Sequence, residues 1–222
     1  MQFAGVRREA DVDRQHPKLL QHLENAALRR DRQREDHQVD TGPAREFNEI
    51  VHGARTRIVE CGSGVSTVVL ARLLRERGAC RLVALEHDRD WAALVREQLR
   101  REALDGTARV LDAPLEGEPP WYGPARLVEV PDEVDLLVVD GPPACDAGHG
   151  MRRAPALPRF EECLVVGAAV MLDDIARPGE RDVLARWEAS TDWRFALDER
   201  AGVAIGRRQK DARATNRNRD SP

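Results

Sequence analysis

The chain has 222 residues, of which 41% are hydrophobic and 33% are charged, and its net charge is −4. This length and composition are those of one soluble α/β domain with a packed core and short extensions. The sequence pI near 5.9 indicates no general attraction to nucleic acid or to an anionic membrane, and no apolar run approaches the ~18 residues of a membrane span. We therefore expect neither partner.

The first residues and the cysteines indicate the compartment. Residues 1–13 carry charges of both signs and lack an apolar segment, so no secretory signal is expected. Among Cys61, Cys80, Cys145 and Cys163 there is no C-x-x-C pair, which argues against a zinc site. Two of the four lie in or beside core-like segments, which argues against a disulfide framework. We expect a cytoplasmic protein with reduced thiols.

The two ends of the chain differ in composition from its middle. Residues 1–42 are charge-dense, and leucines at helical spacing predict an amphipathic helix in this N-terminal extension. Pro43 opens a second predicted helix. Residues 208–222 are polar and predict a disordered tail. The main domain is therefore expected to span residues 43–207.

Strands and helices alternate along the main domain. The predicted strands are 57–61, 81–85, 108–111, 136–139, 168–172, 193–197 and 203–206. Predicted helices begin at Val65 and Asp90, surround Leu157 to Leu164, and start again at Pro178, while residues 117–131 predict a loop rich in Pro and Gly. This alternation predicts a Rossmann-like three-layer sandwich, with a mostly parallel seven-stranded sheet and an antiparallel C-terminal strand.

Acidic side chains stand where the predicted parallel strands end. They are Glu60, Glu86, Asp112, Asp140, Asp173 and Asp174. Right-handed crossovers place the C-terminal ends of parallel strands at one edge of the sheet, and ligands of open α/β sheets bind at that edge. The sequence therefore predicts a ligand site lined by carboxylates.

The segment after the first strand reads E-C-G-S-G-V-S-T, from Glu60 to Thr67. Its glycines let the backbone turn tightly and approach a ligand, and Ser66 and Thr67 stand where a helix N-terminus presents free N–H groups. A carboxylate at Glu60 would repel a pyrophosphate but attract the ammonium or sulfonium of S-adenosylmethionine. Thr67 also replaces the third glycine of a dinucleotide fingerprint. The loop favours S-adenosylmethionine over a nicotinamide dinucleotide.

The next two strand ends supply candidate contacts to a nucleoside. The two oxygens of Glu86 are suited to accept both ribose hydroxyls, a feature shared with nicotinamide enzymes. His87 follows where a neighbour flanks an adenine. Asp112 and Ala113, after the third strand, are candidates for the adenine amino group.

These motifs, in this order, resemble the class I S-adenosylmethionine-dependent methyltransferases. E-C-G-S-G-V-S-T, A-L-E-H-D-R-D-W, D-L-L-V-V-D-G-P-P and V-M-L-D-D-I-A-R-P-G-E follow one another between about residues 57 and 206. The likeness is greatest to a bacterial subset with E-x-G-S-G-x-S-T and V-D-G-P motifs, from which Cys61 departs by replacing an aliphatic or aromatic residue. By resemblance, Glu60, Gly62 and Gly64 hold the methionine end and Glu86 the ribose. The full predicted cofactor set is Glu60, Gly62, Ser63, Gly64, Ser66, Thr67, Glu86, His87, Asp112, Ala113 and Asp140.

Asp140, Asp173 and Asp174 end strands that should be neighbours. Three converging carboxylates repel each other unless a cation or a proton is shared, and a hard divalent ion such as Mg²⁺ has the right ligand preference. Similar acids bind magnesium or calcium in catechol-type, caffeoyl-CoA-type and macrolide-sugar O-methyltransferases. The alternative is that Asp140 faces the cofactor while Asp174 bonds local backbone. Both interpretations stay open at this point.

The acceptor is the least determined part. Asp140 and His149 are the candidate general bases, and a histidine ordinarily titrates near neutrality. The D-G-P-P turn lacks the aromatic residue of the D-P-P-Y turn of nucleic-acid amino-methyltransferases, so a flipped base would have no stacking partner. Trp121 and Tyr122 either line a substrate pocket or pack. We expect a small-molecule acceptor and O-methylation; the alternatives are a non-catalytic binding module and an NAD-dependent oxidoreductase.

Overall fold

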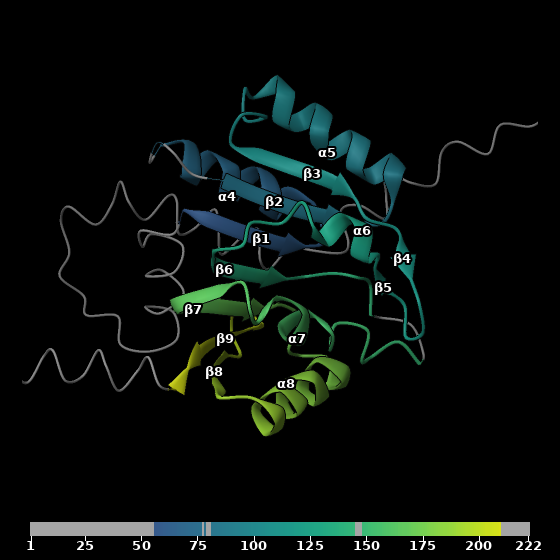
Figure 1. The fold of residues 1–222 in the computed structure, drawn as a ribbon, viewed down its shortest axis with the longest axis vertical. Coiled ribbons are helices and arrows are strands. Elements are labelled where there is room, and N and C mark those ends of the chain that lie inside the picture. Colours follow the sequence, from purple (N-terminus) through teal and green to yellow (C-terminus); the bar gives the residue numbers. More distant parts are fainter. Residues whose placement is uncertain (1–55, 77, 79–80, 145–147, 210–222) are drawn as a thin grey trace, which may run out of the picture.

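Figure 1 shows the chain as a computed structural model, which describes residues 56–76, 78, 81–144 and 148–209. The predicted N-terminal extension, the helix at Pro43 and the tail beyond residue 209 lie outside these residues. The long strands are β1 (Arg57–Cys61), β2 (Arg81–Glu86), β3 (Ala108–Asp112), β6 (Val134–Val139), β7 (Leu164–Leu172), β8 (Trp193–Asp198) and β9 (Val203–Arg208). The helices are α4 (Val65–Arg75), α5 (Arg89–Arg101), α6 (Pro124–Leu127), α7 (Ala156–Phe160) and α8 (Pro178–Ser190).

The seven long strands form one sheet in the order β3-β2-β1-β6-β7-β9-β8. Strands β1, β2, β3, β6 and β7 are mutually parallel, and β9 runs antiparallel to both β7 and β8. The predicted Rossmann-like sheet with an antiparallel C-terminal strand is confirmed. Because β1 pairs with both β2 and β6, the loop after Cys61 lies between Glu86 and Asp140.

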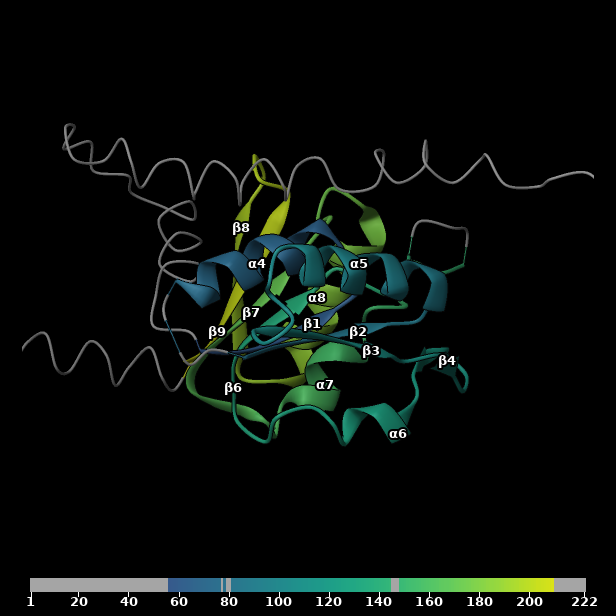
Figure 2. The same ribbon diagram turned by 90° about the horizontal axis from the view of Figure 1, so that it is seen from above.

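Helices cover both faces of the sheet (Figure 2). Helices α4 and α5 bury their apolar residues on one face, together with Ile58, Leu82 and Leu136. Helices α7 and α8 bury theirs on the other face, together with Val59, Leu137 and Val139. Since β6 is buried along its whole length on both sides, its continuous apolar run is what a central parallel strand requires. No helix in the described part of the chain is long and apolar enough to cross a membrane.

The segment predicted as a loop, residues 117–131, is more ordered than expected. It completes a short antiparallel hairpin, β4 (Leu115–Glu116) with β5 (Trp121–Tyr122), and then forms helix α6. Trp121 and Tyr122 are 4% and 1% exposed, with ring centroids 5.0 Å apart. The hairpin thus anchors two aromatic side chains against the face of the sheet that α7 covers.

Strand β7 begins earlier than the predicted strand 168–172. The helix expected to reach Leu164 ends at Phe160, and Leu164 instead pairs with Val134. The register shifts before the next pair, and Gly167 in this stretch has a φ of 78°. A positive φ suits glycine and interrupts regular alternation, which explains why the sequence predicted only the second half of β7. At the C-terminal end, β9 extends one residue into the predicted tail, to Arg208.

Candidate active site

The loop after β1 meets the turn after β6 at two glycines. Gly62 has a φ of 88°, and a Cβ there would lie 3.0 Å from the backbone nitrogen of Gly141. Both the backbone conformation and the close approach require glycine at this position. A Cβ on Gly64 would meet no described atom within 4 Å, so the same loop borders open space two residues later.

Glu60 lies beneath this loop and is fully buried. Ser66 Oγ donates to its Oε1 at 2.5 Å, and Thr67 Oγ1 donates to its Oε2 at 2.6 Å. Thr67 Oγ1 in turn accepts the Gly64 N–H at 2.9 Å. Burial raises the pKa of Glu60 to about 7, although the two hydroxyl donors lower it. The three predicted residues are therefore together, with their side chains bonded to each other; direct contact of Glu60 with a cofactor stays a prediction.

Glu86 at the end of β2 fastens the next part of the loop. Its Oε2 accepts both the N–H and the hydroxyl of Ser63, each at 2.9 Å, and its Oε1 accepts the Asp88 N–H at 2.9 Å. His87 Nδ1 lies 2.9 Å from the same Oε1. Burial alone would raise the pKa of Glu86, but the donors outweigh it and hold that pKa below its ordinary value. Glu86 is thus a carboxylate surrounded by donors.

The third strand end is held by arginine. Arg96 Nη2 lies 2.7 Å from Asp112 Oδ1, and Arg89 Nε lies 3.8 Å from Asp112 Oδ2. Ala113 is fully buried and donates its N–H to the carbonyl of Glu86 at 2.6 Å. The structure therefore places Asp112 and Ala113 beside Glu86, as predicted. Their contact with an adenine stays a prediction.

Tyr122 reaches this site from the β4–β5 hairpin. A Cβ on Gly141 would lie 2.6 Å from Tyr122 Oη and 2.8 Å from Gly62 Cα, so the hydroxyl stands where the two glycine turns meet. The hydroxyl is buried and has no hydrogen-bond partner among the described residues. A buried unpaired hydroxyl is costly, and such groups mark sites that a water or a ligand completes. Sequence reasoning left the role of Tyr122 open between pocket and packing.

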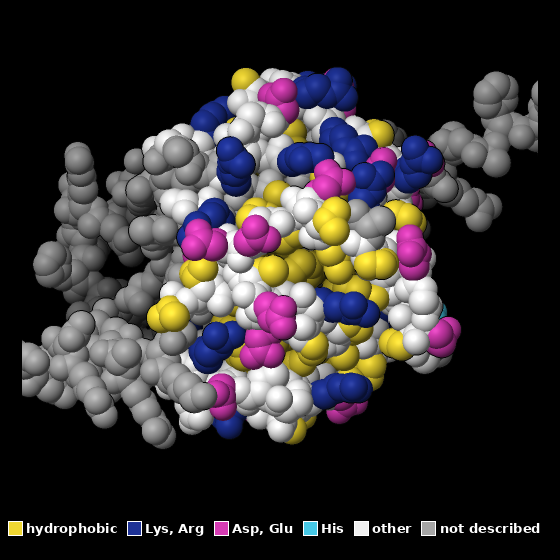
Figure 3. All heavy atoms as spheres, viewed as in Figure 1, with side chains coloured by type: hydrophobic (Ala, Val, Ile, Leu, Met, Phe, Trp, Pro, Cys, Tyr) yellow, Lys and Arg dark blue, Asp and Glu magenta, His cyan; other side chains and the backbone are white. Residues whose placement is uncertain are grey.

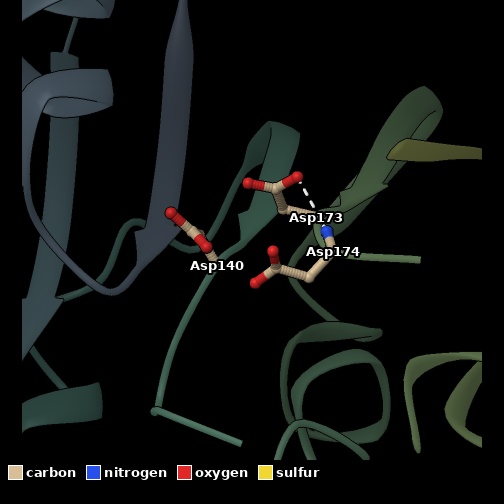
Figure 4. A group of neighbouring side chains, drawn as sticks. All are labelled: Asp140, Asp173 and Asp174. Carbon is tan, nitrogen blue, oxygen red and sulfur yellow. Dashed lines mark hydrogen bonds between the residues drawn. The ribbon is translucent and has the colours of Figure 1, made fainter. Parts of the chain in front are cut away.

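Asp140, Asp173 and Asp174 come together as predicted. Ligand oxygens of the three lie within 4.8 Å of one another, and Figure 4 shows their carboxylates turned toward a common space. Burial raises the pKa values of Asp140 and Asp173 to about 7 each. Asp173, rather than Asp174, bonds local backbone, because its Oδ1 accepts the Asp174 N–H at 2.7 Å. Asp174 has a φ of 65°, which is uncommon for a residue other than glycine.

Sequence reasoning missed Arg153, which lies among these carboxylates and is 1% exposed. Its Nη2 is 3.1 Å from Asp174 Oδ2 and 3.5 Å from Asp140 Oδ1, and its Nη1 is 3.5 Å from Glu180 Oε1. Burial lowers the pKa of Arg153, but the facing carboxylates outweigh burial and raise it above the ordinary value. The only sequence signal was charge balance, since converging acids need a cation.

His149 stands apart from the strand ends, in the loop that leads to Arg153. It lines a cavity of about 520 Å³ together with Pro119, Met151, Arg152 and Arg186. Residues of the hairpin loop and of the loop after Asp140 thus line one cavity, whose role as an acceptor pocket stays a prediction. A larger cavity, of about 710 Å³, lies at the opposite edge of the sheet and contains none of the predicted site residues.

The surface seen in Figure 3 carries both hydrophobic and charged side chains. On the face seen in Figure 3, hydrophobic side chains gather in the region between α6 and α7, and charged side chains surround them. An apolar area with a charged border is typical of sites that take small organic ligands.

Comparisons with known proteins place this geometry in a family. The sequence profile of a methyltransferase domain matches residues 59–175, more than half of the chain. No protein with a curated description matches. A methyltransferase structure from Geobacter sulfurreducens is 21% identical, with 94% of this chain and 98% of that chain covered and a TM-score of 0.51.

Two further structures were solved with SAH (S-adenosylhomocysteine). A Podospora anserina methyltransferase is 16% identical, with 93% of this chain and 98% of that chain covered and a TM-score of 0.53. An O-methyltransferase from Bacillus cereus is 18% identical, with 83% and 89% covered and a TM-score of 0.51. At these identities the likeness shows the fold, while the profile match shows the family. The chain therefore belongs to the methyltransferase domain family and is a class I S-adenosylmethionine-dependent methyltransferase.

Proposed function

We propose that this methyltransferase modifies a hydroxyl group of a small-molecule acceptor and that Asp140 takes the proton of that hydroxyl. The observation that carries the proposal is the cavity of about 520 Å³, whose volume is within the range of small-ligand pockets. Arg152 and Ala154 line it, and between them in sequence stands Arg153, whose guanidinium contacts Asp140. The loop that borders the cavity therefore also supplies the arginine that contacts the candidate base.

The residues at the strand ends fit S-adenosylmethionine. Glu86 offers two carboxylate oxygens to ribose hydroxyls, which would replace the Ser63 hydroxyl and the His87 ring as its partners. The backbone N–H groups of Ser63 and Asp88 would keep their bonds to Glu86. The unpaired hydroxyl of Tyr122 offers a hydrogen-bond donor, and the open space beside Gly64 leaves room for the cofactor. This set supports the predicted cofactor site.

Methyl transfer to a hydroxyl requires that the protein hold the acceptor in line with the methyl donor and supply a group that accepts the hydroxyl proton. When bound, S-adenosylmethionine supplies a methyl group on a positively charged sulfur, which an oxygen nucleophile takes by in-line displacement. Asp140 is suited to hold the proton that the hydroxyl loses, because burial raises its pKa to about 7 and a base works best with a pKa near the working pH. His149 is the second candidate base, since it lines the cavity. Mg²⁺ is left out of this mechanism, because Arg153 already lies among the three aspartates.

The experiment has two stages. Calorimetric titration with S-adenosylhomocysteine is expected to show micromolar binding to the wild type and at least a tenfold loss in Glu86→Ala, since hydrogen bonds to a charged group contribute about 1.5–3 kcal/mol. Glu97→Ala is the matched control, because Glu97 is a half-buried residue of helix α5 that pairs with Arg100 and Arg101. Absence of wild-type binding would refute the cofactor site.

The second stage tests the acceptor. Pairs of small aromatic compounds that differ only in carrying a hydroxyl or an amine are incubated with the enzyme and the methyl donor, and methylated products are detected by mass. We expect methylated hydroxyls, and we expect Asp140→Asn to lose turnover while its affinity for S-adenosylhomocysteine stays close to that of the wild type. Methylation of the amines alone would contradict O-methylation. Binding without any turnover across a broad panel would favour the non-catalytic alternative.

A further inference from the structure

The acids at the ends of β6 and β7 lie so close together that their carboxylates repel one another unless a positive charge lies among them. Asp140, Asp173 and Asp174 face one another within 4.8 Å, and Glu180 of α8 is fully buried beside them. Carboxylate oxygens are the ligand type that a magnesium ion takes, at about 2.0–2.1 Å and in octahedral geometry. The residue types alone therefore fit a divalent cation.

The position of Arg153 changes this conclusion. Its guanidinium contacts Asp140, Asp174 and Glu180, with nitrogen-to-oxygen distances of 3.5, 3.1 and 3.5 Å. A cation that bound the same oxygens would sit against a fixed positive charge in a buried, weakly screening environment, where like charges repel strongly. The guanidinium and a metal ion therefore compete for one place.

Backbone contacts hold Arg153 in this place independently of the carboxylates. Its Nε donates to the carbonyl of Pro142 at 3.3 Å, its Nη1 donates to the carbonyl of Asp173 at 3.2 Å, and its Nη2 donates to the carbonyl of Asp140. If the side chain swung out to admit an ion, these buried carbonyls would lose their donor, and buried polar groups without partners are costly. The planar guanidinium thus donates at the same time to the turn after β6 and to the turn after β7.

The loop that carries Arg153 is itself fixed to α8. Trp187 Nε1 donates to the carbonyl of Ala154 at 2.8 Å. The backbones of Gly150 and Gly179 approach so closely that a Cβ on Gly150 would lie 3.2 Å from Gly179 Cα. One contact before Arg153 and one after it therefore hold its loop against helix α8, which also carries Glu180.

We infer that Arg153 is the resident cation of this enzyme, standing where a divalent metal would stand, and that the aspartates bind no metal ion while it is there. Arg153 is then a positioning residue: it contacts both the carbonyl and the carboxylate of Asp140 and fixes the side chain of the proposed base. The inference goes beyond the proposed acceptor chemistry and does not depend on which acceptor is methylated. It decides against Mg²⁺, which the sequence left open as one of two interpretations, because the three aspartates are present but do not fit an ion beside Arg153.

The test uses Mn²⁺, which takes the same oxygen ligands and is detected directly by its paramagnetic signal. Four full-length proteins are titrated: the wild type, Arg153→Met, Arg177→Met and Asp174→Asn. Arg177 is the matched control, because it also pairs with Asp174, at 2.7 Å, but is 34% exposed and leaves Arg153 in place when removed. We expect no stoichiometric binding to the wild type or to Arg177→Met up to about 1 mM, where even weak oxygen-ligand sites fill.

Arg153→Met is expected to bind one equivalent of Mn²⁺. At about 100-fold above its Kd the ion should raise the melting temperature of this variant by about 5–11 °C and leave that of the wild type unchanged. One equivalent bound by the wild type and lost in Asp174→Asn would overturn the inference, as would a folded Arg153→Met that binds none. If Arg153→Met does not fold, the wild-type titration still decides. Titration with S-adenosylhomocysteine in parallel separates failure of the cofactor site from failure of this inference.

Discussion

The buried carboxyl of Glu60 makes stability depend on pH in a direction opposite to that of a paired surface acid. Its pKa is raised from 4.5 to about 7, mainly by burial. A raised pKa means that the folded state binds the proton of Glu60 more tightly than the unfolded state does. The contribution of this proton to the free energy of unfolding is therefore complete below about pH 4.5 and is lost as the pH rises through 7. At about 1.4 kcal/mol per unit of pKa shift, the full difference corresponds to about 3.5 kcal/mol.

Glu60→Gln removes this titration and keeps the shape of the side chain. The free energy of unfolding is measured by urea denaturation, followed by tryptophan fluorescence, at pH 5 and pH 8. Between these values the wild type should lose about 2.5 kcal/mol more than the variant, while Asp140 and Asp173 titrate in both proteins. Glu102→Gln is the control: the pKa of Glu102 is lowered to about 2 by the guanidinium of Arg72, so that group stays ionised over this range. Equal pH dependence in wild type and Glu60→Gln would refute the reasoning.

Three further substitutions test the packing of the site. Tyr122→Phe removes an unpaired buried hydroxyl, so it should stabilise the free protein by about 1 kcal/mol in chemical denaturation and weaken S-adenosylhomocysteine binding in calorimetry; a loss of stability would show that the hydroxyl has a partner. Gly141→Ala should destabilise by about 1–3 kcal/mol through overpacking, against almost no effect for Gly106→Ala, where a Cβ meets no described atom within 4 Å. Asp88→Ala removes the N-cap of α5 and should lower the melting temperature by about 2–4 °C, most of which Asp88→Asn should restore.

The sheet was predictable because its strands are buried on both faces. Residues 134–139 of β6 are all buried, and a continuous apolar run such as residues 136–139, ending in an acid or a glycine, is visible without any long-range information. Once the parallel order is inferred, the strand ends share an edge. The proximity of Glu86, Gly62 and Asp140 then follows from topology.

The β4–β5 hairpin was not predictable by the same reasoning. Its strands are two residues long, which is too short for periodicity, and Pro119 and Pro120 between them indicate a loop. What holds the hairpin is the burial of Trp121 and Tyr122 against the sheet, a tertiary contact that no local pattern records. For the same reason the interpretation of Tyr122 as pocket or packing could not be decided from the sequence.

Arg153 shows that residue types alone do not predict which group balances the charge of a carboxylate cluster. The sequence M-R-R-A-P, from Met151 to Pro155, carries two adjacent arginines of opposite fate: Arg152 lines the cavity, whereas Arg153 is buried among the acids. The Trp187 bond and the close approach of Gly150 to Gly179 select which one turns inward. Acids at strand ends are placed by the sheet, but their counter-charge comes from a loop whose path is set by packing. A carboxylate cluster read from sequence therefore predicts that a cation is present, and only the fold decides whether that cation is a metal ion or a side chain.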